Sequence, residues 1–310
     1  MPRRRDPVAS GVLVVDKPAG ITSFDVVREA RRRIGERKAG HTGTLDPLAT
    51  GVLPICFGEA TKIVSLLTAD DKAYRATGEL GLETDTLDTT GAVVVRAAWG
   101  EVRREQVEQA LETMLGPQLQ VPPAYSALHV DGERAYERAR RGEEVKLEPR
   151  PVEIDTLALV RWDPPSFEID VACSKGTYVR SLIADVGRRL GCGAALAALR
   201  RTRSGRFTVE QSLPLERVDR GTPLLSIYEA LSHLPDLEVS AAEADGLRHG
   251  QPFAPADMQS VPSDVLLRLR CTGQLVALGE RRRGKVWPRR VFVGEHRVEV
   301  SGGGEAGTEG

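Results

Sequence analysis

A glycine-rich loop at residues 40–51 (GHTGTLDPLATG) holds one carboxylate, Asp46, and one imidazole, His41. Three glycines and a proline restrict the loop to tight turns, so both side chains are held in defined directions. The loop contains no second carboxylate and no cysteine. A single, rigidly held aspartate suits a nucleophile or a charge stabiliser better than one half of an acid–base pair. Asp before Pro is also a common helix start, in which the carboxylate only caps the first turn.

The composition is that of an ordinary globular chain of 310 residues, 41% hydrophobic and 28% charged. Its length predicts one large and one smaller domain, because single cores stop growing at roughly 250–300 residues. The four cysteines form no CxxC pair, which indicates reduced thiols and neither a disulfide framework nor a zinc site. The sequence contains no signal peptide and no apolar run near the ~20 residues of a membrane helix, so we expect a cytoplasmic protein.

The charged residues are segregated, although the net charge is only -1. Runs at 28–38, 199–206 and 281–290 are rich in arginine, whereas acidic residues gather elsewhere, as at 101–112. Segregated charge can give a nearly neutral protein a basic face that binds phosphates. The alternative is that these runs are only solvated surface.

Hydrophobic periodicity predicts the elements that must position the loop. Strands are expected at 11–16, 73–80, 152–162, 166–173 and 205–209. Helices are expected at about 59–67, 107–115, 178–190 and 194–199. A further helix begins at Thr22 or Ser23, with Phe24, Val27 and Ile34 near one face. Because strands outnumber helices and do not alternate with them regularly, we expect an α+β fold and not a parallel α/β fold.

Composition shifts predict the domain organisation. Residues 1–10 form an N-terminal extension, and residues 11–232 form the large domain. Within it, a charged segment bounded by prolines, about 124–151, is expected to be an insertion standing off the core. Residues 233–300 form a small β-rich unit, and the Gly-rich residues 301–310 are expected to be disordered.

The loop and the residues that follow it, up to Lys62, resemble the catalytic motif of the TruB family of pseudouridine synthases. Four other segments match that family in order: DKPAGITS at 16–23, DKAYRA at 71–76, SKGTYVR at 174–180 and LRR at 199–201. One position departs from the family pattern, with Val179 in place of isoleucine. The first of these segments packs against the catalytic loop in the family. The C-terminal unit more weakly resembles a PUA domain, a small RNA-binding β-barrel, through residues 246–252 and 273–279.

The resemblance implies a pseudouridine synthase fold, with a mixed, mainly antiparallel central sheet flanked by helices. It also implies the isomerisation of uridine 55 in the T loop of tRNA. It makes Asp46 the catalytic residue and Arg180 its ion-pair partner. Tyr74 is expected to stack on the target base, and Tyr178 and Leu199 to line the pocket. It also implies RNA contacts for a further set of side chains: His41, Lys62, Arg138, Arg141, Arg200 and Arg201.

Pseudouridine formation breaks the N1–C1′ bond of uridine, turns the base and joins C5 to C1′. Because the product is an isomer, we expect no cofactor and no metal. An Asp with a reference pKa of about 3.9 is ionised at neutral pH, and the Arg180 guanidinium is expected to keep Asp46 ionised and oriented. Two routes stay open: attack of Asp46 on C1′, or removal of the 2′ proton to give a glycal.

The implied partner is the T stem-loop of tRNA, recognised by shape and phosphates. Flipping the uridine out costs a few kcal/mol, and stacking on Tyr74 returns roughly 1–3 kcal/mol. His41 is expected to fill the space that the flipped base leaves. The 124–151 insertion is interpreted as a thumb that closes over the stem-loop. We expect no protein partner, no membrane association and a monomer.

Three other functions remain open on the sequence. A guide-RNA-dependent, dyskerin-like synthase shares the catalytic core but lacks the thumb-like insertion and works with partner proteins. A non-catalytic RNA-binding protein or tRNA chaperone would not require Asp46, Tyr74 and Arg180 together. An unrelated hydrolase using Asp46 would need a second carboxylate or a Ser–His pair.

Overall fold

The computed structural model describes residues 9–293, apart from residues 127, 131 and 144. Most of the predicted N-terminal extension and the whole predicted disordered tail therefore lie outside the described residues. None of the described helices is long and apolar enough to span a membrane.

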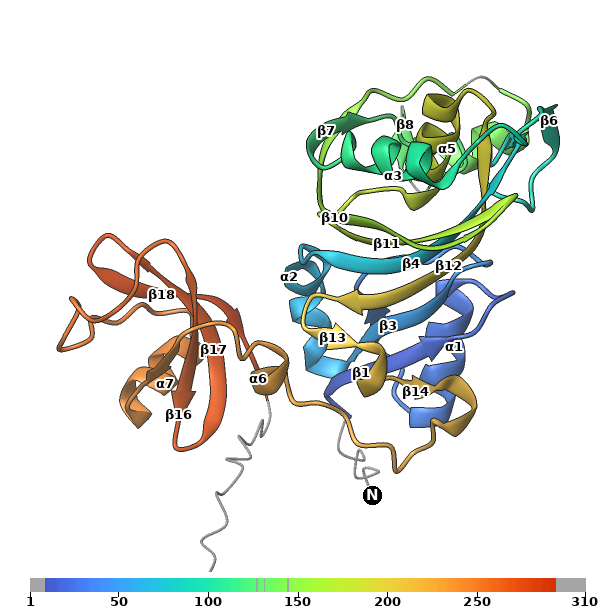
Figure 1. Ribbon diagram of the computed structural model, residues 1–310. Helices are drawn as coiled ribbons and strands as arrows, with labels where there is room; N and C mark the ends of the chain where they lie inside the picture. The colour runs from blue at the N-terminus through green and yellow to red at the C-terminus, as the bar shows by residue number, and fades with distance from the viewer. Residues whose placement is uncertain (1–8, 127, 131, 144, 294–310) are drawn as a thin grey trace, which may run out of the picture.

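A ten-stranded mixed sheet forms the centre of the large domain (Figure 1). Eight strands run in the order β14-β1-β3-β12-β4-β11-β10-β7, with β2 paired to β3 and β13 to β12. Only the β1–β14 and β3–β12 pairs are parallel. The strands are β1 (Gly11–Lys17), β2 (Ala39–His41), β3 (Thr50–Phe57), β4 (Lys72–Leu80), β7 (Gly116–Gln120), β10 (Arg150–Asp163), β11 (Ser166–Cys173), β12 (Ala194–Ser204), β13 (Phe207–Thr208) and β14 (Leu213–Pro214).

Helices flank this sheet, and the α+β prediction is confirmed. Figure 1 shows α1 beside the lower part of the sheet and α3 and α5 beside the upper part. The helices of the large domain are α1 (Ser23–Ile34), α2 (Val64–Thr68), α3 (Arg104–Glu112), α4 (Ala135–Arg140), α5 (Val179–Leu190) and α6 (Ile227–Ala230). Short 3-10 turns are η1 (Gly58–Ile63), η2 (Val209–Gln211) and η3 (Leu215–Arg217).

The predicted helix at 194–199 is wrong, because these residues begin strand β12. The alanines and leucines of this segment favour a helix when they are considered alone. In the fold, β12 lies between β3 and β4 and pairs with β4 along most of its length. These sheet partners override the local preference, since strand propensity depends mainly on the neighbours that a strand packs against.

Helix α1 begins as predicted but buries a different face. Thr22 caps its N-terminus by accepting a hydrogen bond from the backbone N–H of Asp25. Phe24, expected to face inward, is 66% exposed. Ser23 takes the inward position of the first turn, and the buried face continues through Val26, Val27, Ala30 and Ile34. The helical period of 3.6 residues therefore points the Phe24 ring into solvent.

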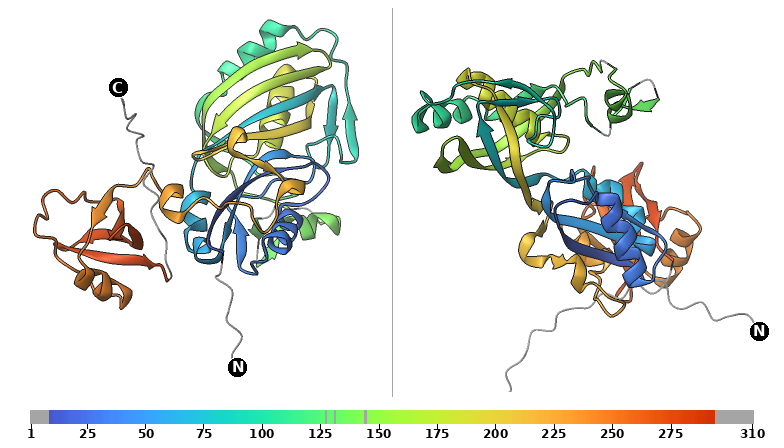
Figure 2. Two further views of the ribbon diagram at one scale, coloured as in Figure 1. Left: turned by 90° about the horizontal axis from the view of Figure 1, so that it is seen from below. Right: turned by 90° about the vertical axis from the view of Figure 1, so that its right-hand side faces the viewer.

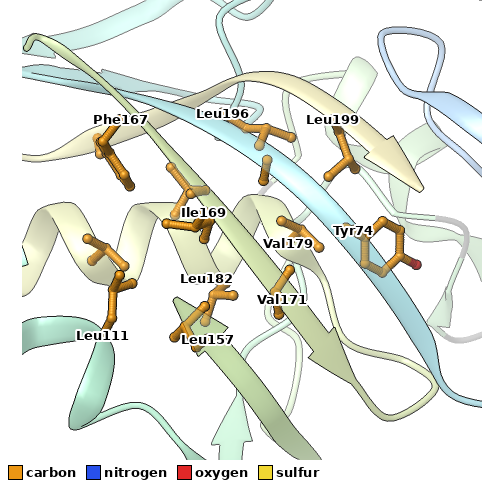
Figure 3. Close-up of a cluster of buried hydrophobic side chains, with 14 of the residues drawn as sticks. Tyr74, Leu111, Leu157, Phe167, Ile169, Val171, Val179, Leu182, Leu196 and Leu199 are labelled. Atoms are coloured by element: carbon orange, nitrogen blue, oxygen red, sulfur yellow. The ribbon is translucent and has the colours of Figure 1, made fainter. Parts of the chain in front are cut away.

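The largest hydrophobic cluster lies between β4, β10, β11 and β12 on one side and α3 and α5 on the other. Figure 3 shows it with Leu111, Phe167 and Leu182 inside and Tyr74 at its edge, the hydroxyl directed away from the aliphatic side chains. Leu45 and Ala49 of the glycine-rich loop belong to the same cluster. The loop is therefore anchored in the core at both flanks of Asp46.

The segment predicted to be an insertion contains a short hairpin, β8 (His129–Val130) and β9 (Glu133–Arg134), followed by α4. The right-hand view of Figure 2 shows this part standing away from the sheet. A second hairpin, β5 (Leu82–Thr84) and β6 (Val93–Arg96), leaves the end of β4. Arg180 contacts Thr86 in the loop of this hairpin and Tyr125 near the start of the predicted insertion.

The C-terminal unit is an open four-stranded sheet in the order β15-β16-β17-β18, with one helix, α7 (Ala241–Arg248). Its strands are β15 (Asp236–Glu238), β16 (Leu266–Cys271), β17 (Gln274–Arg282) and β18 (Lys285–Val291). The predicted closed barrel is not found among the described residues. Figures 1 and 2 show this unit beside the large domain. Leu278 and Phe292 belong to the same buried cluster as Ala60 and Ile63 of η1.

Candidate active site

Asp46 lies in the loop between β2 and β3, whose backbone is fixed at several points. Gly20 N–H donates to the Pro47 carbonyl at 2.7 Å, and Ala49 N–H donates to the Asp46 carbonyl at 3.0 Å. Gly51 has a φ of +100°, and a Cβ there would lie 2.2 Å from the Arg201 carbonyl oxygen. Only glycine fits this position, because the backbones of β3 and β12 meet there.

Lys17 holds the same loop from inside the protein. Its side chain is 0% exposed, and Nζ donates to the carbonyls of Ala49 at 2.7 Å, Pro18 at 2.9 Å and Pro47 at 3.3 Å. Burial lowers the pKa of Lys17 to about 8, although Asp46 opposes that shift. The expectation that DKPAGITS packs against the loop is thus confirmed. The burial of Lys17 was not anticipated, because its role depends on carbonyls 30 residues or more away.

Replacing Lys17 with methionine should lower the free energy of unfolding by about 1–3 kcal/mol, because it leaves buried carbonyls without a donor. The unfolded chain binds the Lys17 proton more tightly than the folded one, since the folded pKa is lowered from 10.5 to about 8. Wild-type stability should therefore rise relative to Lys17→Met between about pH 8 and pH 10.5. Urea unfolding of both proteins across this range measures the difference. If the difference in free energy of unfolding between wild type and Lys17→Met became smaller with rising pH, this account of Lys17 would be contradicted.

Arg180, in the first turn of α5, joins Asp46 to two other segments. Its Nε lies 2.9 Å from Asp46 Oδ2, and only 5% of its side chain is exposed. Nη1 donates to the Thr86 carbonyl and Nη2 to the Tyr125 carbonyl, each at 2.9 Å. All three nitrogens of the planar guanidinium thus have a partner. The fixed guanidinium in turn sets the direction of the Asp46 carboxylate.

Asp88 is a buried acid of the site that the sequence analysis missed. It is 4% exposed, and its Oδ2 lies 3.8 Å from Arg180 Nη1. Its Oδ1 accepts from Thr86 Oγ1 at 2.9 Å and from the backbone and side chain of Thr90 at 3.0 and 2.5 Å. Leu87, just before it, has a φ of +62°, a left-handed conformation that is costly for leucine. The sequence TDTLDTTG at residues 84–91 predicts a turn. Nothing in its spacing predicts that Asp88 contacts Arg180.

The charge state of Asp46 results from opposing effects. Burial raises its pKa above the ordinary 3.8, Arg180 and Lys17 lower it, and Asp88 raises it. The net direction is upward, so Arg180 offsets the cost of burial only in part. The Asp46 side chain remains 35% exposed, so a substrate can reach its carboxylate. The site therefore presents one oriented carboxylate to a ligand.

The structure places the three predicted pocket residues, Tyr74, Tyr178 and Leu199, on β4, at the start of α5 and on β12. Tyr74 on β4 is 9% exposed and Leu199 on β12 is 8% exposed, and both belong to the same buried cluster as Leu45. Tyr178 caps α5, where Gln120 binds both its N–H at 2.7 Å and its carbonyl at 3.1 Å. Burial raises the pKa of both tyrosines, which therefore stay protonated at neutral pH. Asp46 is among the groups that act electrostatically on both tyrosines, so the two rings lie near its carboxylate.

The predicted RNA-binding residues of the large domain differ in exposure. His41 ends β2 and accepts a hydrogen bond from the Gly43 N–H at 3.2 Å through Nδ1. Arg200 is 40% exposed and binds Asp16 at 2.8 Å.

The prediction that Arg201 faces RNA is wrong, because this residue is 1% exposed. It donates to the carbonyls of Val52 and Gly43 at 2.7 and 3.1 Å, and so supports the loop from within.

The remaining candidates contact other parts of the chain. Arg138 and Arg141 belong to the segment that contains α4, where both form ion pairs with Glu143. Arg141 also binds Glu133 at 2.5 Å. Lys62 lies at the end of η1, against the C-terminal unit. Among the described residues, no group of three or more His, Cys, Asp and Glu could hold a metal ion.

Comparisons with known proteins agree with this geometry. The family model "TruB family pseudouridylate synthase (N terminal domain)" matches residues 31–179, and "tRNA pseudouridylate synthase B C-terminal domain" matches residues 180–223. A protein of Stutzerimonas stutzeri named tRNA pseudouridine synthase B is 42% identical over 94% of this chain and 98% of its own length. One of the same name from Syntrophotalea carbinolica is 46% identical over 78% of this chain and 81% of its own.

Solved structures show the same fold. A chain of a Cbf5-Nop10-Gar1 complex is 26% identical, with a TM-score of 0.69 over 91% of this chain and 85% of that chain. A chain of a box H/ACA ribonucleoprotein bound to a substrate RNA, at 24% identity and a TM-score of 0.67, covers 92% of this chain and 85% of its own. Sequence, fold and family models agree, and the chain belongs to the TruB family of pseudouridylate synthases.

Proposed function

We propose that this protein converts uridine 55 in the T loop of tRNA to pseudouridine, with Asp46 as its catalytic residue. The observation that carries the proposal is the Arg180–Asp46 pair. Its 2.9 Å contact fixes the carboxylate, whose side chain is still 35% exposed. Tyr74 and Tyr178 lie near enough to interact electrostatically with Asp46. The curated relatives at 42–46% identity are named tRNA pseudouridine synthase B, which identifies tRNA as the RNA to test.

The chemistry requires little from the protein beyond a positioned carboxylate. The N1–C1′ bond of the uridine breaks, the detached base turns and the C5–C1′ bond forms. The C5 proton leaves and N1 takes up a proton, so the product is an isomer. In one route Asp46 attacks C1′ and is later displaced by C5; in the other it first removes the 2′ proton. Arg180 orients the carboxylate in both routes. Tyr74 stacks on the flipped base, and Leu199 closes the apolar side of the pocket.

His41 assists the flipping step in this proposal. The target uridine lies within the folded T loop, so it must leave its stack before Asp46 can reach the sugar. His41 ends the strand that leads into the Asp46 loop. Its side chain is expected to occupy the space that the base leaves.

The direct test is to incubate unmodified tRNA transcript with the protein and to map pseudouridine by chemical derivatisation and primer extension. Modification at position 55 alone is expected. A transcript in which uridine 55 is replaced by cytidine is the matched control, and it should show no modification. Modification only at other positions would reject uridine 55 as the target.

The segment that contains α4 is proposed to be a thumb that closes over the T stem-loop. Replacing residues 128–147 with a short Gly-Ser linker keeps Tyr125, whose carbonyl binds Arg180, and keeps strand β10. We expect tRNA affinity to fall by about tenfold or more, because phosphate contacts provide much of RNA affinity, while the core stays folded. Filter binding and thermal unfolding measure the two effects. A folded deletion variant with wild-type tRNA affinity would refute the thumb.

We also propose that the protein acts on tRNA as a monomer, without a protein partner. The relatives named tRNA pseudouridine synthase B are 42–46% identical, whereas the chains from ribonucleoprotein complexes are 24–26% identical. The chain also carries its own thumb-like segment. A guide-dependent function is therefore the weaker alternative, and activity of the purified protein on tRNA alone would reject it.

A further inference from the structure

A buried cation, Arg201, lies against the loop that carries Asp46. The residue is 1% exposed, and among the described residues no carboxylate forms an ion pair with its guanidinium. Burying a charge without an oppositely charged partner is costly for the fold. A neutral side chain with the same hydrogen bonds would support the loop without that cost. The buried charge therefore indicates a role beyond support of the loop.

Three acceptors from different segments hold the Arg201 guanidinium. Nε donates to the Val52 carbonyl of β3 at 2.7 Å, and Nη2 donates to the Gly43 carbonyl of the loop at 3.1 Å. The third acceptor is the hydroxyl of Tyr74 on β4. Arg201 and Tyr74 are directly opposite each other in the antiparallel β12–β4 pair. Such pairs place their Cβ atoms about 4.5–5.5 Å apart on the same face of the sheet.

The contact with Arg201 holds the far end of the Tyr74 side chain. Its backbone is held by β4, which pairs with β11 on one side and β12 on the other. Figure 3 shows the hydroxyl directed away from the aliphatic side chains of the cluster. Burial raises the pKa of Tyr74 and Arg201 opposes that rise, so the guanidinium also acts electrostatically on the phenol oxygen. The ring is thus fixed both at the backbone and at its oxygen.

The same guanidinium contacts the loop between His41 and Asp46. A Cβ at Gly43 would lie 3.5 Å from Arg201 Nη1, so the guanidinium packs directly against this part of the loop. Burial lowers the pKa of His41 and Arg201 lowers it further, which keeps the imidazole neutral at neutral pH. One rigid, planar group therefore connects the Tyr74 ring to the loop that carries Asp46.

We propose that Arg201 is a positioning residue that fixes the distance between the Tyr74 ring and the Asp46 loop. The proposal rests on the proposed function, in which Tyr74 stacks on the flipped uracil while Asp46 acts on its ribose. Because the N1–C1′ bond joins base and ribose, ring and carboxylate must be correctly spaced for both contacts to form at once. A misplacement of about 1 Å in an active site can lower a rate by about 10²-fold.

A double-mutant cycle tests whether Arg201 acts through Tyr74. Arg201→Lys keeps the charge and a carbonyl donor, but an ammonium cannot bind all three acceptors at once. Tyr74→Phe keeps the ring and removes the hydroxyl. We expect Arg201→Lys to lower the single-turnover rate by about 10²-fold in the wild-type background. In the Tyr74→Phe background the same substitution should lower the rate several-fold less, because the contact is already absent.

The affinity for tRNA separates positioning from binding. Arg201 is buried and cannot reach a phosphate, so filter binding should change far less than the rate. Arg203→Lys is the matched control, because Arg203 lies on the same strand and donates to the Gly205 carbonyl at 3.1 Å. This control should keep the wild-type rate, and its effect should not depend on Tyr74.

Equal losses of rate from Arg201→Lys in the two backgrounds would overturn the proposal, because they would show that Arg201 only supports the loop. Thermal unfolding checks that each variant is folded. If Arg201→Lys does not fold, Tyr74→Phe alone gives the answer: a several-fold lower rate is expected, and a wild-type rate would overturn the proposal. A wild-type protein that forms no pseudouridine in tRNA would instead reject the proposed function.

Discussion

Replacing Asp46 with asparagine should abolish pseudouridine formation and leave the fold and tRNA affinity intact. Asparagine has the same shape as aspartate, but it can neither attack C1′ nor accept a proton as a carboxylate does. Loss of a group that reacts directly with substrate costs about 10⁴-fold or more in rate. Single-turnover kinetics with excess enzyme measures the chemical step apart from binding. Filter binding of the same tRNA checks the affinity.

Asp163→Asn is the matched control for this variant. Asp163 is 64% exposed at the end of β10 and paired with the surface residue Arg161. The Asp163→Asn substitution removes the same charge but lies outside the site. Its single-turnover rate should therefore stay at the wild-type value. A rate for Asp46→Asn within tenfold of wild type would exclude Asp46 as the catalytic residue.

The second large effect is expected from Arg180→Lys. Arginine reaches Asp46, the Thr86 carbonyl and the Tyr125 carbonyl with different nitrogens of one rigid fork. A lysine ammonium is a single point and cannot satisfy these three acceptors at once. We expect the single-turnover rate to fall by about 10²–10³-fold, the usual cost of losing one preorganised electrostatic contact. Arg188→Lys, on the exposed face of the same helix, should have no effect.

The pH dependence of Arg180→Met tests the electrostatic part of this account. Burial raises the pKa of Asp46, and Arg180 opposes that rise. Removing the guanidinium should therefore raise the pKa of Asp46 further. Because the ionised form reacts, the acidic limb of the residual rate should move to higher pH than in the wild type. A limb that stays in place or moves to lower pH would show that Arg180 does not control the Asp46 charge.

Much of the site was accessible from the sequence because its parts depend on local rules. The glycines and Pro47 indicate a rigid loop around Asp46 before any partner is known. The apolar spacing after Tyr178 predicts α5, and with it the place of Arg180 in the first turn. The family resemblance then supplied the pairing of Arg180 with Asp46, which the 2.9 Å contact confirms.

The missed features depend on contacts between distant segments. Residues 194–199 favour a helix locally and become a strand because β3 and β4 flank them. Arg201 belongs to a basic run, yet its position opposite Tyr74 in the sheet buries it. Asp88 meets Arg180 across more than 90 residues of chain, and the local pattern around it indicates only a turn. Hydrophobic periodicity carries no information on such pairings.

The measurement that tests the central claim most directly uses tRNA transcript labelled with tritium at C5 of uridine 55 alone. Pseudouridine formation must release that hydrogen, because C5 becomes bonded to C1′. With excess wild-type protein we predict release of one tritium for each tRNA, and none with Asp46→Asn. Full retention of tritium by the wild-type reaction, with the tRNA still bound, would contradict the account and leave an RNA-binding protein. Equal release by both proteins would contradict the role of Asp46.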